Sequence, residues 1–213
     1  MGEQTMAQAK QAEAPQHAHD ITDLDLSCVA RGTKIATRRG EVLVEELKAG
    51  DEVVSRDKGL AAVRWIGRVT TSTIAVKVPP GAMGRRVPAR DCWVAPNARL
   101  WMQGAEFEGT FASREVLVPA KDLVGWRGIA EDPTASSEFF LVLCDTPSVM
   151  IVDGMQVEMR HPGALISLFD QVQADEMADL FPELLALDTT SDKWRRRLDK
   201  HEAAQVVDVK KRA

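Results

Sequence analysis

Residues 28–37 read CVARGTKIAT, and the stretch continues with RGEV at 39–42, VEEL at 44–47 and GDEVV at 50–54. Short apolar runs in this stretch are separated by turns that contain glycine, which is the pattern of successive β-strands. A cysteine opens the stretch and follows a segment of different composition. The arrangement therefore places one thiol, that of Cys28, at the junction between a leader and a folded domain.

The strand pattern continues to about residue 157. Apolar runs at 62–66, 74–78, 92–94, 100–102, 116–118, 139–143 and 149–152 are divided by turn residues such as Pro79-Pro80-Gly81 and Asp153-Gly154. This spacing of short strands and turns is typical of an all-β domain. A domain of ~150 residues can bury roughly 70% of its unfolded surface, so we expect a mainly β fold with one core.

From Cys28 to Val54 the chain resembles the Hint superfamily, the self-processing modules shared by hedgehog proteins and inteins. It is most similar to the bacterial free-standing Hint-domain proteins. The cysteine, a Gly-Thr turn, a strand, a Gly-Glu-Val hairpin and a Gly-Asp turn carry the resemblance. It implies a β-rich horseshoe domain over residues 26–160 with short C-terminal α-helices. The start and end of such a domain come together, which would bring Cys28 near Asp145 and Asn97.

The resemblance also implies a reaction. The thiol of Cys28 would attack the carbonyl of Ser27 and turn the peptide bond between them into a thioester, so the chain's own N-terminal segment is the expected substrate. Such a site needs a nucleophilic sulfur, an acid for the departing amine and donors for the oxyanion. Cys28, Asp145 and Asn97 are the candidate catalytic residues, and Arg99 is a further candidate to replace a missing acid.

The proton donors of the family are absent from the corresponding positions. Alanine, Ala98, stands where active Hint domains carry a histidine in the 94–101 segment. Two more histidines of bacterial relatives correspond to Phe140-Leu141 and Asp145-Thr146-Pro147, where only the aspartate remains. Splicing is excluded, because Val157-Glu158-Met159 replaces the His-Asn end. Two functions stay open: slow cleavage after Ser27, or a non-catalytic scaffold or protein-binding module that keeps the fold.

Two further patterns allow weaker hypotheses. Cys28 and His161 could serve as nucleophile and base of a cysteine hydrolase, although His161-Pro162-Gly163 is more typical of a turn. Arg85, Arg86 and Arg90 could present a surface to an anionic partner, and a solvated loop is the alternative.

The remaining cysteines and tryptophans predict packing rather than chemistry. Cys92 and Cys144 lie in apolar runs, and three widely spaced cysteines suit neither a disulfide framework nor a zinc site. We therefore expect reduced thiols, buried in the cases of Cys92 and Cys144, with no metal and no cofactor. Core and sheet-face packing is the prediction for the tryptophans at 65, 93, 101 and 126.

Bulk properties limit the partners. The formal net charge is −5 with 28% charged residues, which provides no broad basic surface for nucleic acid. No run of ~18 apolar residues and no signal peptide are found, so we expect a cytoplasmic protein without a membrane partner, with signal-independent export left open.

Both ends of the chain differ from the middle. Residues 1–25 are rich in Gln, Ala and Glu and are predicted to form a disordered leader. Residues 161–207 are predicted to form a helical extension, with two short helices around Met177 to Leu185 that are interrupted at Pro182. A third helix is expected from Ser191, as N-cap, to about Val206. Residues 208–213 are expected to be a solvated basic tail.

Overall fold

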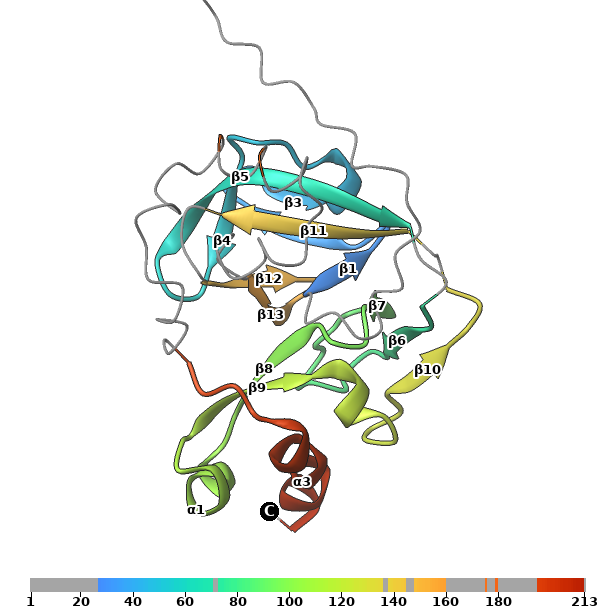
Figure 1. Cartoon of the computed structure of the whole chain (residues 1–213), viewed down its shortest axis with the longest axis vertical. Coiled ribbons are helices and arrows are strands. Elements are labelled where there is room, and N and C mark those ends of the chain that lie inside the picture. The colour runs from blue at the N-terminus through green and yellow to red at the C-terminus, as the bar shows by residue number, and fades with distance from the viewer. Residues whose placement is uncertain are drawn as a thin grey trace, which may run out of the picture.

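A computed structural model describes residues 27–70, 73–135, 138–144, 148–159, 175, 179 and 195–212. Within these ranges, thirteen strands form one curled sheet with the order β10-β6-β7-β1-β11-β5-β4-β2-β12-β13-β8-β9, and β3 pairs with β2 (Figure 1). The predicted mainly β fold is therefore confirmed. The strands are β1 (Cys28–Ala30), β2 (Lys34–Thr37), β3 (Gly40–Leu43), β4 (Glu52–Ser55), β5 (Gly59–Thr70), β6 (Ala75–Val78), β7 (Cys92–Val94), β8 (Arg99–Gln103), β9 (Glu115–Pro119), β10 (Ala130–Asp132), β11 (Glu138–Cys144), β12 (Ser148–Val152) and β13 (Met155–Met159).

The long strand β5 explains how the sheet curls. Its first residues, Gly59 to Ala62, pair with β4, and the remainder of the strand pairs with β11. Figure 1 shows β5 and β11 side by side with β1 next to β11. The short strand β1 is therefore an interior strand, with β11 on one side and β7 on the other.

The core lies inside the curl and is built from aliphatic and aromatic side chains. The largest fully buried ones include Ile35, Leu100, Phe107, Phe139 and Leu143. Burying each such side chain contributes about 1.5–3 kcal/mol relative to exposure. These residues come from strands β2, β8 and β11 and from the short helix η2 (Ala105–Phe107), so one core joins distant parts of the sheet.

The turn predicted at Asp153-Gly154 is confirmed as a two-residue hairpin between β12 and β13. Both residues have positive φ, 45° and 83°, which a type I′ turn requires. The Asp153 carboxylate accepts the Lys34 backbone N–H at 3.2 Å and pairs with Arg90 at 2.7 Å. Arg90 is thus neutralised by the hairpin and is not available to an anionic partner.

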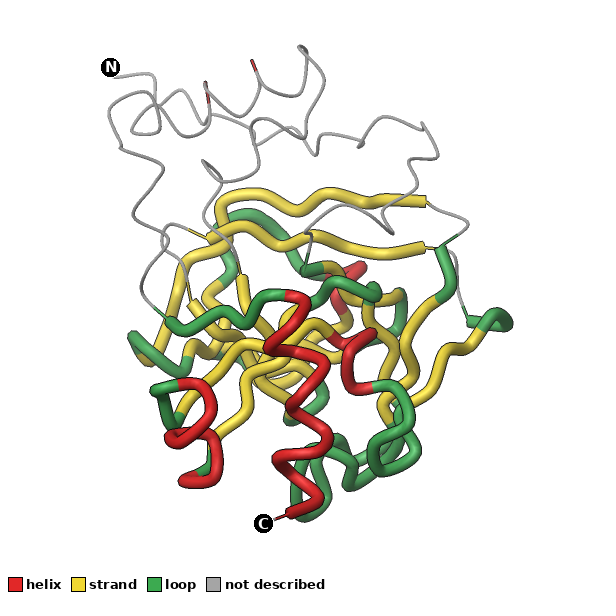
Figure 2. Tube along the Cα trace, turned by 60° about the horizontal axis from the view of Figure 1, so that its bottom comes forward, coloured by secondary structure: helices red, strands yellow, loops and turns green. Residues whose placement is uncertain are grey.

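Short helical turns connect the strands. They are η1 (Val44–Glu46), η2 (Ala105–Phe107), α1 (Glu108–Phe111) and η3 (Ala120–Leu123). The C-terminal helix α3 (Lys200–Arg212) packs against η3, η2 and β9. Figure 2 shows this helix lying beside the shorter helices, across the strands.

The helix predicted from Ser191 to about Val206 has the wrong bounds. Residues 195–199 are not helical, and helix α3 begins at Lys200. Asp199 caps it, since its carboxylate accepts the Glu202 N–H and the Glu202 carboxylate accepts the Asp199 N–H, a reciprocal capping box. The predicted basic tail is also wrong for residues 208–212, which form the last turns of α3, where cations favour the helix dipole.

Residues 195–199 run along β9 instead. The Leu117 N–H donates to the Arg196 carbonyl at 2.8 Å, and the Leu198 N–H donates to the Leu117 carbonyl at 3.1 Å. This parallel bridge covers β9, which is the last strand at one edge of the sheet. We call residues 195–212 the C-terminal strap. Of the two short helices predicted around Met177 to Leu185, only Asp175 and Asp179 are described, and both are helical.

Candidate functional site

Cys28 begins β1 and is fully buried, opposite Leu141 of β11. The Cys28 carbonyl accepts the Ala95 N–H at 2.9 Å. The neighbouring Ser27 is also buried, and its Oγ accepts the Arg99 N–H at 3.3 Å. The Ser27–Cys28 peptide bond therefore lies against the segment that connects β7 to β8.

That connecting segment, residues 95–98, is a tight turn held from both sides. The Ala98 N–H donates to the Ala95 carbonyl at 3.0 Å and closes the turn at Pro96 and Asn97. On the other side, Ala120 donates to the Ala98 carbonyl and Lys121 to the Pro96 carbonyl, both at 2.9 Å. Asn97 and Ala98 are buried. The structure thus brings the turn that carries Asn97 to the Ser27–Cys28 junction.

Two of the residues proposed from the sequence cannot be placed. Asp145 and His161 lie outside the described residues. Within the described part, β8 connects the two ends of the domain, because it contacts Ser27 through Arg99 and pairs with β13 at Leu100 and Val157.

The Cys28 thiol is poorly activated. Burial raises its pKa to about 12, and no charge in the described part of the chain offsets this shift. A thiol with that pKa is ionised to about one part in 10⁵ at pH 7, whereas the thiolate is the nucleophilic form. The junction is consequently well held, but its sulfur is almost entirely protonated at neutral pH.

The raised pKa predicts a loss of stability in alkali. The thiol titrates near 9 in the unfolded chain and near 12 in the folded one, so its stabilisation is present below pH 9 and is lost as pH rises toward 12. Between pH 9 and 12 the unfolding free energy of the parent should fall more steeply with pH than that of the Cys28→Ala variant, by up to about 1.4 kcal/mol per pH unit. Urea unfolding of both proteins at a series of pH values measures this slope. The lysines titrate in both proteins, so their contribution cancels when the two unfolding free energies are subtracted. Parallel curves for the two proteins would contradict it.

A buried carboxylate beside the junction was not predicted from the sequence. Glu158 of β13 is fully buried and pairs with Arg197 of the strap at 2.7 Å and with Arg99 Nε at 3.9 Å. Arg99 also donates from Nη1 to the Leu198 carbonyl at 3.2 Å. The side chain of Arg99 is therefore fixed by β13 and the strap, while its backbone N–H holds Ser27.

The other cysteines behave as predicted. Cys92 and Cys144 are buried, and all three thiols are free. Burial and the neighbouring Asp153 carboxylate raise the pKa of Cys92. In the described ranges, no three His, Cys, Asp or Glu side chains gather as metal ligands would.

No helix among the described residues combines the length and the apolar character needed to cross a bilayer.

Comparison with known proteins gives a family match and several structural likenesses. The bacterial intein-like domain from Clostridium thermocellum is 15% identical, with 63% of this chain and 99% of that chain covered and a TM-score of 0.47. A DnaB intein from Synechocystis sp. PCC 6803 is 17% identical, with 63% and 99% covered and a TM-score of 0.41. No curated protein matches. The family model described as "Hint domain" matches residues 27–164, more than half of the chain, and the match begins at Ser27, beside the buried thiol. This chain therefore belongs to the Hint-domain family.

Proposed function

We propose that the protein slowly cleaves its own chain at the Ser27–Cys28 bond. The observation that supports this most is the pair of hydrogen bonds on either side of that bond, from Arg99 N–H to Ser27 Oγ and from Ala95 N–H to the Cys28 carbonyl. These bonds fix both residues of the scissile bond on a rigid sheet. Positioning of this kind lowers the entropic part of a barrier even where proton transfer is poor.

The proposed step conserves atoms and charge. The Cys28 thiol loses its proton, and its sulfur attacks the Ser27 carbonyl carbon to form a tetrahedral intermediate. The C–N bond then breaks, the amine of Cys28 takes up a proton, and Ser27 is left as a thioester on the sulfur. Water or an added thiol attacks this thioester, releases residues 1–27 and restores the Cys28 thiol. No metal or cofactor takes part in this sequence.

Two physical terms make the reaction slow. The rise of the Cys28 pKa from 9.0 to about 12 lowers the thiolate concentration at neutral pH by about 10³. General acid–base assistance is commonly worth ~10²–10⁴ in rate, and the histidine that supplies it in active relatives is replaced by Ala98. Cleavage should therefore need long incubation, and an added thiol should increase its yield by capturing the thioester.

Intact-mass measurement of the full chain tests the proposal. We expect a mass loss that corresponds to residues 1–27 during prolonged incubation with thiol at mildly alkaline pH, because more thiolate is present there. The Cys28→Ala variant is the control and should keep its full mass. Loss of the same residues from both proteins would point to proteolysis and contradict the proposal.

A non-catalytic scaffold or binding module is the second candidate function. It is favoured by the complete burial of Cys28 together with the alanine at position 98. The same measurement separates the two, since a scaffold keeps its full mass with and without thiol at every pH.

A further inference from the structure

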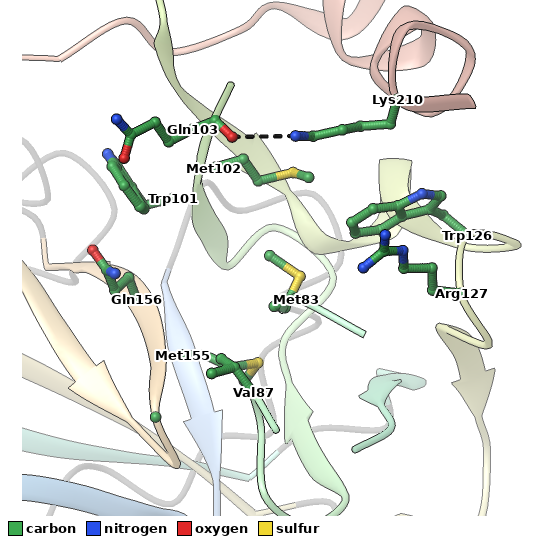
Figure 3. Close-up of a pocket in the computed structure, with 11 residues that line it drawn as sticks. Met83, Val87, Trp101, Met102, Gln103, Trp126, Arg127, Met155, Gln156 and Lys210 are labelled. Carbon is green, nitrogen blue, oxygen red and sulfur yellow. Dashed lines mark hydrogen bonds between the residues drawn. The ribbon is translucent and has the colours of Figure 1, made fainter. Parts of the chain in front are cut away.

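A small hollow of mixed polarity lies along β8, the strand whose first residue holds Ser27. It has a volume of about 250 Å³, and its lining combines polar side chains, Gln103 and Gln156 among them, with two tryptophans and three methionines: Trp101, Trp126, Met83, Met102 and Met155. Figure 3 shows these side chains converging from β8, from the β12–β13 hairpin and from two loops. Pockets for drug-sized ligands begin at ~300 Å³, so the hollow suits a few aliphatic side chains of a peptide. Methionines adapt well to such side chains.

One arginine lines this hollow and two more lie on a turn whose stems line it, and none of them has an ion-pair partner among the described residues. Arg127 is exposed and lies over the Trp126 ring at 5.0 Å. Arg85 and Arg86 are exposed at the tip of a tight turn whose two stems, Met83 and Val87, line the hollow and are joined by a 2.9 Å backbone hydrogen bond. None of the three arginines forms an ion pair with a described residue.

The other cations near the hollow are already neutralised. Lys210 donates to Glu106 and to the Gln103 carbonyl, as the dashed line in Figure 3 shows for the latter. Arg56, whose guanidinium lies over the Trp101 ring, is paired with Glu115 at 3.6 Å. Among these described cations around the hollow, the unpaired ones are therefore Arg85, Arg86 and Arg127, on a chain whose formal net charge is −5. Such a local patch attracts an acidic segment.

The sequence just before the junction has the matching composition. Residues 20–26 read DITDLDL, in which three aspartates are interspersed with Ile21, Leu24 and Leu26. Aspartates can pair with the three arginines while aliphatic side chains enter a hollow lined by tryptophan and methionine. One stretch of the same chain thus complements both the tryptophan and methionine side chains of the hollow and the arginines near it.

The distances allow this segment to reach the hollow. Ser27 is held by Arg99, the first residue of β8, and Trp101 to Gln103 of the same strand line the hollow. At ~3.3 Å per strand residue, these positions lie about 7–13 Å from Arg99. Seven extended residues span up to about 25 Å, so residues 20–26 cover that distance with length to spare.

We propose that residues 20–26 bind in this hollow, with their aliphatic side chains against the methionines and their carboxylates against Arg85, Arg86 and Arg127. The inference deepens the proposed self-cleavage, on which it rests for the role of this segment as the substrate side of the bond. Binding there would immobilise the acyl side of the Ser27–Cys28 bond, as the hydrogen bonds to Ser27 Oγ and to the Cys28 carbonyl immobilise the junction itself.

Photo-crosslinking of the full chain tests the binding. Leu24 is replaced by p-benzoylphenylalanine in the Cys28→Ala background, which keeps residues 1–27 attached. We expect crosslinks to peptides that contain Met83, Met102 or Met155, mapped by mass spectrometry. The variant Arg85→Glu/Arg86→Glu/Arg127→Glu should lower the crosslink yield about tenfold, as the loss of three surface ion pairs would. Added salt should lower the yield of the parent in the same direction.

A matched variant controls for net charge. Arg38→Glu/Arg39→Glu/Arg114→Glu reverses three exposed arginines whose partners are Glu52, Asp51 and Glu108, and it should leave the yield unchanged. Equal yields in the two triple variants, crosslinks that map away from the hollow, or a product with the mass of a dimer would overturn the inference. Because Cys28 is absent, the result does not depend on cleavage: crosslinks to the hollow beside an uncleaved parent would refute the proposed function alone.

Discussion

Replacing Ala98 with histidine is expected to accelerate cleavage at the Ser27–Cys28 bond by about 10²–10⁴-fold, the usual worth of a positioned acid or base. Ala98 belongs to the turn whose Ala95 N–H binds the Cys28 carbonyl, and the next residue, Arg99, binds Ser27. An imidazole there would stand beside the departing amine, and its pKa near 6.5 suits proton transfer at neutral pH. The rate of loss of residues 1–27, followed by intact mass, measures the effect.

The controls separate proton transfer from disturbance of the turn. Ala98 is fully buried, so a larger side chain costs about 1–3 kcal/mol of stability, which a thermal melt records. Ala98→Gln introduces comparable bulk without a titrating group and should not accelerate cleavage. Ala98→His combined with Cys28→Ala should not cleave. A folded Ala98→His variant that cleaves no faster than the parent would contradict the expectation, because the absence of a histidine would then not be what limits the cleavage rate.

Local chemistry explains which parts of the fold were predictable. Asp153-Gly154 between two apolar runs is a strong hairpin signal because few residues other than Gly, Asn and Asp tolerate positive φ at both turn positions. The short apolar and alternating runs likewise predict most of the strands, because each strand of the sheet must bury one or both of its faces. The capping box could also be recognised in the sequence, because Glu202 follows Asp199 at the spacing of that motif. The helix was predicted to begin at Ser191 instead, and the structure contradicts that start because residues 195–199 run along β9.

Non-local pairing explains what the sequence could not reveal. Nothing near Arg196 in the sequence indicates that its carbonyl binds Leu117, because the two residues are far apart along the chain. The same holds for Glu158. Its place in the sequence corresponds to the end where inteins carry His-Asn, but its role as partner of Arg99 and Arg197 depends on three separate segments meeting.

The candidate site shows the same division. The resemblance drew attention to Cys28 and to the 94–101 segment, and the structure brings Cys28 and the 95–98 turn together. The degree of burial of the thiol could not be predicted, because it depends on the packing of β7 and β11 on both sides of β1. That packing sets the pKa of Cys28 and hence the expected slowness of cleavage.

Glu158→Gln is expected to lower the free energy of unfolding by about 3–5 kcal/mol, the cost of breaking a buried ion pair by removing one partner. The variant leaves the guanidinium groups of Arg197 and Arg99, which are only 17% and 14% exposed, without their shared carboxylate. Glutamine nearly preserves the volume of glutamate, so the effect reports charge rather than packing. Urea unfolding of the two proteins measures the difference.

Glu52→Gln is the matched control. Its pair with Arg38 is exposed, and exposed pairs are worth about 0–1 kcal/mol, a contribution that salt screens further. Because Arg197 belongs to the strap, Glu158→Gln should also make residues 195–212 more sensitive to protease under native conditions, whereas Glu52→Gln should not. Similar small effects in both variants would mean that the strap does not depend on the Glu158–Arg197 pair and is held by its other contacts, such as the backbone bonds to Leu117 and the ion pairs of Arg195. A large effect that is specific to Glu158 would establish that one carboxylate ties β13, the strap and, through Arg99, the Ser27 junction into a single cooperative unit.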